Sequence, residues 1–130
     1  MAVMVGMTGS VSHVVTPDDT ARALLSGDVD VLGTPRVVAW LEEATMAAVA
    51  PGVRDSDVCV GTRVLLEHVQ PSAVGHRVEA TATVTAIDGR IITLEVDLTR
   101  RDDDGDILLA HGEITRVVLS RQGFVDRLGS

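Results

Sequence analysis

Hydrophobic and polar residues alternate along most of the chain, and the period of that alternation changes between its first and second halves. Between residues 34 and 50, small and aliphatic residues recur every three or four positions, the spacing of a helix with one buried face. Thr34 and Pro35 are typical of a helix start, and Pro51 and Gly52 of a helix end. The pattern predicts one amphipathic helix with Thr34 as its N-cap. Its buried face would carry Val37, Leu41, Ala44, Thr45 and Ala48.

From residue 58 onward the alternation has a period of two, which is typical of β-strands. The segments that follow it are residues 58–69, 75–87, 90–101 and 107–120. Between the second and third of them, Asp88-Gly89 is typical of a two-residue type I′ hairpin turn. A shorter alternating segment, residues 10–16, precedes the helix. The order is therefore strand, long helix, then four consecutive antiparallel strands.

One helix is too small to cover both faces of such a sheet, so the sheet should wrap around it. The predicted fold class is α+β, a hotdog fold with an antiparallel sheet around one long central helix. A steroid-isomerase-like cone or a ferredoxin-like sandwich would need further helices, which the pattern does not indicate. We expect residues 1–130 to form a single hotdog domain in which residues 1–9 are disordered.

Composition narrows the classes of partner. Of the 130 residues, 45% are hydrophobic but only Trp40 and Phe124 are aromatic, so the core must be aliphatic. The formal charge of −8 repels nucleic-acid phosphates and anionic lipids, so we expect neither nucleic acid nor a membrane as a partner. An anionic ligand such as CoA would need a local basic patch. Candidates for it are Arg54, Arg63, Arg77, Arg90, Arg100 and Arg101.

The cysteine and histidine positions predict no metal site. Cys59 is the only cysteine and lies between two valines, which favours a buried, inert thiol. His13, His76 and His111 have no metal-ligand spacing with a carboxylate or a cysteine. We therefore expect no metal and no cofactor. The first residues lack a basic leader and a long apolar run, which predicts a cytoplasmic protein.

Two polar residues stand where the predicted helix and sheet should meet. Glu42 lies at the edge of the buried helical stripe, whereas Glu43 lies opposite it and is expected in solvent. Strict alternation places His68 on the same face of its strand as Val64 and Leu66, and also as Val58, Val60 and Thr62. A carboxylate and an imidazole at one interface can perform acid–base catalysis or activate a nucleophile. The alternatives are a glutamate turned to solvent and a histidine satisfied in the core.

Three further positions are candidates for the same site. Thr34 would stand at the helix N-terminus, where free N–H groups can bind an oxyanion, although Pro35 removes one donor. Arg116 shares the inward face of the last strand and needs an anionic partner, either Glu42 or the pyrophosphate of CoA. Gly61 permits close approach of a ligand to the backbone, or marks a bulge.

Over roughly residues 10–120, these positions resemble the fluoroacetyl-CoA thioesterase family of hotdog proteins. Thr34, Glu42 eight positions later, and His68 twenty-six positions after that match the spacing of the family's Thr/Glu/His set. Gly61 and Arg116 match its glycine before the histidine and its last-strand arginine. Its turns match Pro71 to Gly75 and Asp88-Gly89.

The resemblance implies an acyl-CoA thioesterase that hydrolyses a thioester to a carboxylate and free CoA, and acts as a homodimer. Its active sites would lie at the subunit interface and use residues of both chains. Thr34, Glu42 and His68 would be catalytic, with Glu42 as nucleophile or base and His68 in acid–base steps. Gly61 and Arg116 would contact the substrate. No cofactor is implied, because the CoA thioester is itself the substrate.

Two departures from the family pattern bear on the substrate. Residues 20–33, before the helix, hold no aromatic residue where the family has an aromatic gate, and Pro35 replaces a glycine. The aliphatic segment predicts a different acyl group, larger and without fluorine. A hotdog dimer that binds acyl-CoA or another apolar ligand without cleaving it is the alternative function. A hotdog hydratase is a third reading, for which the sequence shows no matching motif.

Overall fold

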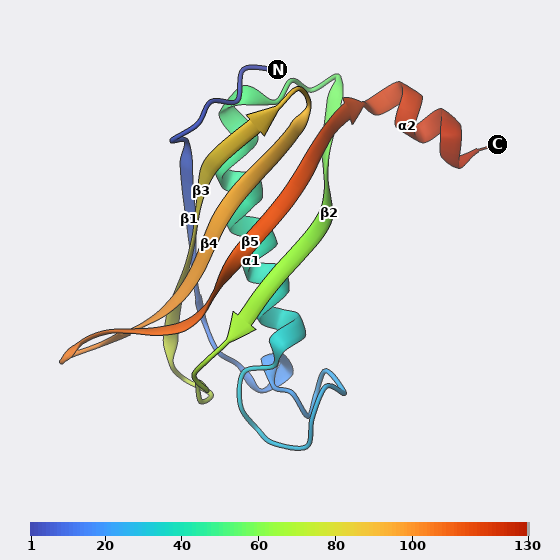
Figure 1. Ribbon diagram of the computed structural model, residues 1–130. Coiled ribbons are helices and arrows are strands. Elements are labelled where there is room, and N and C mark those ends of the chain that lie inside the picture. The colour runs from blue at the N-terminus through green and yellow to red at the C-terminus, as the bar shows by residue number, and fades with distance from the viewer. Residues whose placement is uncertain (130) are drawn as a thin grey trace.

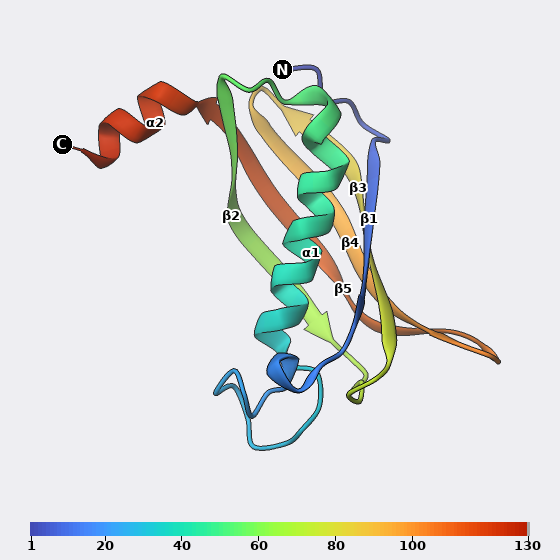
Figure 2. The same ribbon diagram turned by 180° about the vertical axis from the view of Figure 1, so that it is seen from behind.

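The computed structural model describes residues 1–129 and has five antiparallel strands and one long helix. The elements that form the domain are β1 (Thr8–Val14), α1 (Thr34–Val49), β2 (Asp57–His68), β3 (Arg77–Asp88), β4 (Ile91–Asp102) and β5 (Gly105–Ser120). The strands lie in the order β1-β3-β4-β5-β2, so that β1 and β2 are the two edges. One face of the curved sheet holds α1, which runs along its length (Figures 1 and 2). The predicted hotdog fold is confirmed.

The core lies between α1 and the concave face of the sheet and is aliphatic, as the composition requires. Val37, Leu41 and Ala44 of α1 are fully buried against alternate residues of β3 and β4. Because an α-helix repeats every 3.6 residues and a strand every two, these apolar sets each fall on one face and meet there. The predicted buried stripe of the helix is confirmed, including the polar Thr45.

A β-bulge changes the inward face of β2 at its centre. The register with β5 shifts between Gly61 and Arg63, so two residues of β2 stand opposite one of β5. Before the bulge it is Cys59 that is buried, so the expectation that Val58, Val60 and Thr62 share the inward face of His68 is wrong. The extra residue at the bulge reverses the side on which every following side chain lies.

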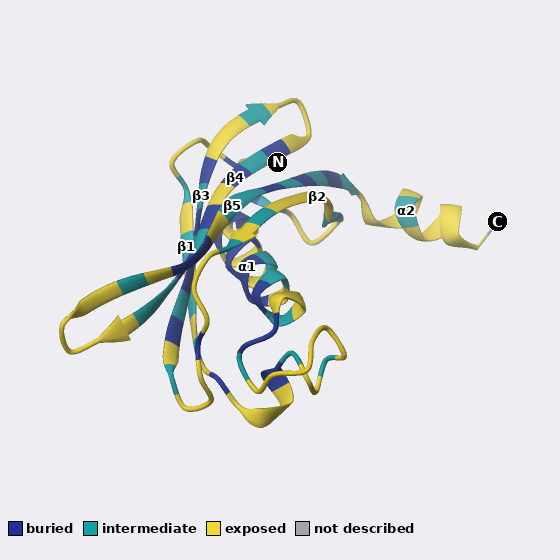
Figure 3. Cartoon of the chain, turned by 60° about the horizontal axis from the view of Figure 1, so that its bottom comes forward, coloured by how far each residue is buried: buried dark blue, intermediate teal, exposed yellow. Residues whose placement is uncertain are grey.

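The two ends of the chain differ from what we expected. Residues 1–9, expected to be disordered, lie against the domain: the Ala2 N–H donates to Gly52 O at 2.7 Å, Val3 is buried, and Thr8 and Gly9 belong to β1. Burial of the Val3 side chain stabilises the ordered position of this end of the chain. After β5, an unforeseen helix α2 (Arg121–Leu128) projects beyond β2, with none of its residues buried (Figures 1 and 3).

Two short 3-10 turns complete the chain, Pro17–Asp19 and Ala50–Gly52. Between the first turn and α1, residues 20–33 form a loop that Thr20 and Leu32 close through a β-bridge, while Val31 bridges to Ala73. This loop lies over the N-terminal end of α1 and next to the end of β2 (Figure 2). No helix within residues 1–129 is both long enough and apolar enough to cross a membrane.

Candidate active site

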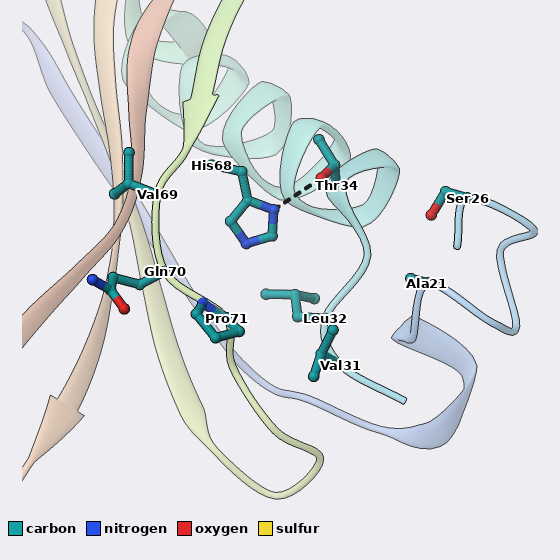
Figure 4. Close-up of a pocket in the computed structure, with 9 residues that line it drawn as sticks. All are labelled: Ala21, Ser26, Val31, Leu32, Thr34, His68, Val69, Gln70 and Pro71. Carbon is teal, nitrogen blue, oxygen red and sulfur yellow. Dashed lines mark hydrogen bonds between the residues drawn. The ribbon is translucent and has the colours of Figure 1, made fainter. Parts of the chain in front are cut away.

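The structure brings Thr34 and His68 together. Thr34 begins α1 and His68 ends β2, and Thr34 Oγ1 lies 2.9 Å from Nδ1 of the imidazole (Figure 4). His68 faces the helix because it follows the bulge in β2, on the same side of the strand as Leu66. A hydroxyl and an imidazole at this distance can exchange a proton.

Thr34 is not the helix N-cap. The N-cap is Gly33, whose carbonyl accepts hydrogen bonds from the N–H groups of Arg36 at 3.0 Å and Val37 at 3.2 Å. Pro35 stands at the second helical position and has no N–H. The expectation that Thr34 caps the helix is therefore wrong, and its hydroxyl is bound to His68 instead. The Arg36 bond occupies one of the N–H groups that a helix start can offer to an oxyanion, and Pro35 lacks another.

The surroundings of His68 favour the neutral form of its imidazole. Burial lowers the pKa of His68 below its usual value, because the charged form loses solvation, and the backbone at Gln70 offsets part of this effect. Its Nε2 is buried and has no hydrogen-bond partner within residues 1–129. A neutral histidine that contacts a hydroxyl through Nδ1 is suited to accept a proton near neutral pH.

A cavity of about 310 Å³ opens beside this pair. The loop of residues 20–33 forms one wall, and the chain that leaves β2 at Val69 and Gln70 forms the other (Figure 4). Among the described residues that line it, His68 is the only one whose side chain can become charged. Aliphatic side chains alternate in its lining with the polar Ser26, Thr34, His68 and Gln70. Such a mixed, concave lining suits a small organic ligand.

Glu42, Gly61 and Arg116 form a second cluster near the middle of α1. Arg116, on β5, is buried with 5% of its surface exposed, and its Nη1 lies 3.7 Å from Oε2 of Glu42. A Cβ added to Gly61 would lie 2.9 Å from the same Oε2. Glycine is needed here because the carboxylate lies directly against the backbone of β2. The Glu42 side chain remains 40% exposed, at the open edge of the sheet.

The other donors of Arg116 are used inside the protein. Its Nη2 donates to the carbonyl of Cys59 at 2.7 Å, its Nη1 to Thr45 Oγ1 at 3.3 Å, and its Nε contacts the Cys59 sulfur at 3.3 Å. Arg116 is thus held in place beside Glu42. The sequence marked Thr45 as a polar residue on the buried stripe but did not identify it as a partner of the guanidinium. That Arg116 contacts the substrate stays a prediction.

The two clusters are separate within one chain. Eight residues of helix separate Glu42 from Thr34, a rise of about 12 Å along the axis. No hydrogen bond or ion pair in the described part of the chain joins Glu42 to Thr34 or to His68. The meeting of carboxylate and imidazole that the sequence suggested does not occur within a single subunit.

The arginines proposed for a basic patch do not gather in one place. Arg77, Arg100 and Arg101 lie at one end of the β3–β4 pair, and Arg90 lies in the turn at its other end. Several are paired: Arg54 with Asp57, Arg100 with Asp102, and Arg101 with Glu79. A single chain therefore has no patch made of all six.

The remaining histidines have structural partners. His13 Nε2 lies 2.6 Å from Glu43 Oε1, and the ring stacks on Trp40 with the centroids 4.6 Å apart. His76 accepts the backbone N–H of Ala73 at 3.0 Å. Within residues 1–129, no three His, Cys, Asp or Glu side chains are grouped so that they could hold a metal ion.

Comparison with known proteins assigns the chain to a family. A family model described as fluoroacetyl-CoA-specific thioesterase matches residues 15–122. A threonine-to-serine variant of the fluoroacetyl-CoA thioesterase FlK, in complex with acetyl-CoA, superposes with a TM-score of 0.85 at 23% identity over 96% of each chain. A thioesterase superfamily member from Thermus thermophilus also gives 0.85 and 23%, over 98% of this chain and 93% of that one. No curated protein matches the sequence.

Proposed function

Because the chain belongs to the fluoroacetyl-CoA-specific thioesterase family, and is thus a thioester hydrolase acting on acyl-CoA, we propose that Thr34, Glu42 and His68 are its catalytic residues. The observation that supports this most is the 2.9 Å contact between Thr34 Oγ1 and His68 Nδ1 beside a cavity. The reaction adds water to the thioester carbonyl and breaks the C–S bond. Its products are a carboxylate and the thiol of CoA.

His68 handles the protons in this proposal. Its neutral imidazole, with a pKa lowered by burial, accepts the proton of the water molecule that hydrolyses the acyl group, either directly or from Glu42. The resulting imidazolium gives this proton to the sulfur of CoA, which is the leaving group. The Thr34 hydroxyl orients the ring through Nδ1 and can donate a hydrogen bond to the substrate carbonyl when the substrate is bound. This hydrogen bond would stabilise the developing oxyanion in place of an N–H group of α1.

Glu42 supplies either the nucleophile or the base that activates water. As a nucleophile, its carboxylate would form an anhydride with the acyl group and release CoA before water enters. As a base, it would take a proton from a water molecule that attacks directly. Arg116 and the backbone at Gly61 fix its position in both cases. A single turnover in ¹⁸O-labelled water tests the first case: label that enters Glu42 shows that its carboxylate is the nucleophile.

The protein acts as a homodimer in this proposal, with Glu42 brought to Thr34 and His68 across the interface. β2 is an edge strand, and the side chains of Val64 and Leu65 on it are 36% and 49% exposed. An unpaired apolar edge favours pairing with a second copy, and a two-fold axis makes the two β2 strands antiparallel. The His68 end of one β2 then lies beside the earlier half of the other, which carries Gly61 and faces Glu42.

The central test measures CoA release with a thiol reagent for Glu42→Ala, His68→Ala and wild type over a panel of acyl chain lengths. We expect both variants to lose at least about a hundredfold in kcat while they keep the circular dichroism spectrum of the wild type. Leu108→Ala, at an exposed position of β5 whose side chain lines neither the cavity nor the Glu42 cluster, serves as the matched control. If both variants matched wild type on every substrate, this assignment of the site would be wrong. The panel also identifies the acyl group, which we propose is larger than fluoroacetyl because residues 20–33 are aliphatic.

A further inference from the structure

The C-terminal helix α2 is aimed away from its own domain by a fixed anchor. The Arg121 N–H donates to Ser56 O at 2.9 Å, and its guanidinium donates to the carbonyls of Asp55 and Asp57, both at 3.1 Å. The Ser120 hydroxyl caps the helix by accepting the Gly123 N–H. These bonds tie the start of α2 to the start of β2 and leave the rest projecting past the β2 edge (Figures 1 and 2).

Beyond this anchor, α2 has an uncovered apolar surface. Val125 is 53% exposed and Leu128 73%, and no residue of α2 is buried. A helix of eight residues is marginal in water without tertiary packing. The second copy that we propose at the β2 edge would lie on the side toward which α2 projects. The exposed apolar residues of α2 would therefore face the partner subunit.

The loop of residues 20–33 has an uncovered apolar residue of its own. Leu25 is 92% exposed and has φ of +59°, the left-handed backbone conformation that a leucine rarely adopts. The Leu25 N–H donates to Arg22 O at 3.3 Å, but the side chain lies almost fully in solvent and packs on nothing within residues 1–129 of its own subunit. A contact of this side chain with a second subunit would offset the backbone strain.

The symmetry of the dimer brings the two surfaces together. The α2 anchor lies at the start of β2, whereas loop 20–33 and the Thr34–His68 cavity lie at its other end (Figure 2). When two β2 strands pair antiparallel about a two-fold axis, the start of one strand lies beside the end of the other. The exposed face of α2 then adjoins the partner's loop 20–33.

Phe124 gives this contact a role in the reaction. The chain has two aromatic residues, and Trp40 is buried in the core against His13. Phe124 of α2 is half-buried and is the one aromatic side chain that lies outside the core. We propose that α2 of one subunit docks on loop 20–33 of its partner, against Leu25, and places Phe124 as a wall of the partner's Thr34–His68 cavity that selects the acyl group. This inference rests on the proposed homodimeric thioesterase.

Cysteine cross-linking tests the contact. The double variant Leu25→Cys, Leu128→Cys should form a covalent dimer under mild oxidation on a non-reducing gel, and each single variant should not. Leu25→Cys with Leu108→Cys, which also pairs two exposed positions, is the control and should stay uncrosslinked. If no cross-link forms, light scattering of the reduced protein shows whether the dimer itself is present. A dimer without the cross-link overturns this inference alone, and a monomer overturns the proposed dimer as well.

Phe124→Ala tests the role in selection. We expect kcat/KM for the preferred acyl-CoA to fall about tenfold through KM, and the order of preference among chain lengths to change. A helix that only stabilises the dimer would lower activity on all acyl groups equally, and that result would overturn the assignment. Phe124→Leu, which keeps an apolar side chain, should restore most of the lost affinity. Light scattering confirms that both variants remain dimers before their kinetics are compared.

Discussion

Thr34 Oγ1 lies 2.9 Å from Nδ1 of His68, although 34 positions separate the two residues in the sequence. The contact exists because α1 begins beside the point where β2 ends, and because the bulge at Gly61 turns His68 toward the helix. It leaves the hydroxyl free from helix capping, which Gly33 performs through its carbonyl. The chemistry and the stability of this end of α1 can therefore be separated by mutation.

Thr34→Val removes the hydroxyl while it keeps the shape of the side chain. We expect kcat to fall by about ten- to a hundredfold, because the imidazole loses its partner at Nδ1. Loss of an N-cap would cost about 1 kcal/mol, but Thr34 does not cap α1, so we expect a loss below about 0.5 kcal/mol in the free energy of unfolding. Thr34→Ser keeps the hydroxyl and serves as the control. A large loss of stability with unchanged kcat would return Thr34 to a structural role.

Burial of His68 predicts how activity depends on pH. Its pKa is lowered from the model-peptide value of 6.5, so the neutral imidazole persists below that pH. We expect the midpoint of the acidic limb of kcat/KM to lie below pH 6.5, because the lowered pKa delays the protonation of His68. A pH profile of kcat/KM for a stable acyl-CoA measures this. A midpoint at or above pH 6.5 would contradict it.

The same shift predicts a pH dependence of stability. The unfolded chain binds the proton of His68 at higher pH than the folded chain, so the free energy of unfolding falls as the pH drops through 6.5. The contribution is fully present above pH 6.5 and is lost between that value and the lowered folded pKa. Urea unfolding of wild type and His68→Gln at pH 7.5 and 5.0 measures the difference. We expect the variant to lose less stability than the wild type over this interval.

Gly61 is needed for the position of Glu42. In Gly61→Ala the new Cβ would lie 2.9 Å from Oε2 of Glu42 and 3.5 Å from Nη1 of Arg116, so the carboxylate must move. Because the end of a glutamate side chain is flexible and 40% exposed, we expect little change in melting temperature but a clear fall in kcat. Thermal melts and thiol-release assays of the same preparation test this. An active Gly61→Ala enzyme would show that Glu42 need not lie against the strand.

The fold was largely predictable from the period of the hydrophobic pattern. The helix was predicted over residues 34–50 and is found at Thr34–Val49, and the four later strands lie within two residues of the predicted bounds. Helix α2 was not predicted, because its three apolar residues, Phe124, Val125 and Leu128, are too few to define a helical period, and none of them is buried in the subunit. A stripe is informative only for elements that pack on their own domain.

The site was predictable in part. Alternation with Val64 and Leu66 placed His68 on the inward face, but the same alternation was wrong before Gly61, because an inserted residue leaves no periodic signal. The pairing of Arg116 with Thr45 and Cys59 was missed, since it joins three elements far apart in the sequence. In the proposed dimer Glu42 meets His68 of the other subunit, and the hydrophobic pattern of one chain carries no information on a contact between two.

Mixing two inactive variants tests whether each active site uses both subunits. Glu42→Ala and His68→Ala homodimers each lack one catalytic group in both sites. In a mixed dimer, a site that takes Glu42 from one chain and His68 from the other is intact on one side and doubly defective on the other. Subunit exchange, with half of the dimers mixed at random, should therefore restore about a quarter of the wild-type activity.

The recovered activity shows whether Glu42 and His68 of one site come from the same chain or from two. If Glu42 and His68 of one site came from the same chain, every site in a mixed dimer would lack one of them, and no activity would return. Exchange is followed with differently tagged variants, so that failure to mix is recognised from the absence of doubly tagged dimers. Mixing Glu42→Ala with Arg116→Met is the control, because Arg116 contacts Glu42 of its own chain. We expect no regain above the two variants' own activities there, since both defects affect the same carboxylate: each mixed dimer still has one site without Glu42 and one in which Glu42 has lost its guanidinium.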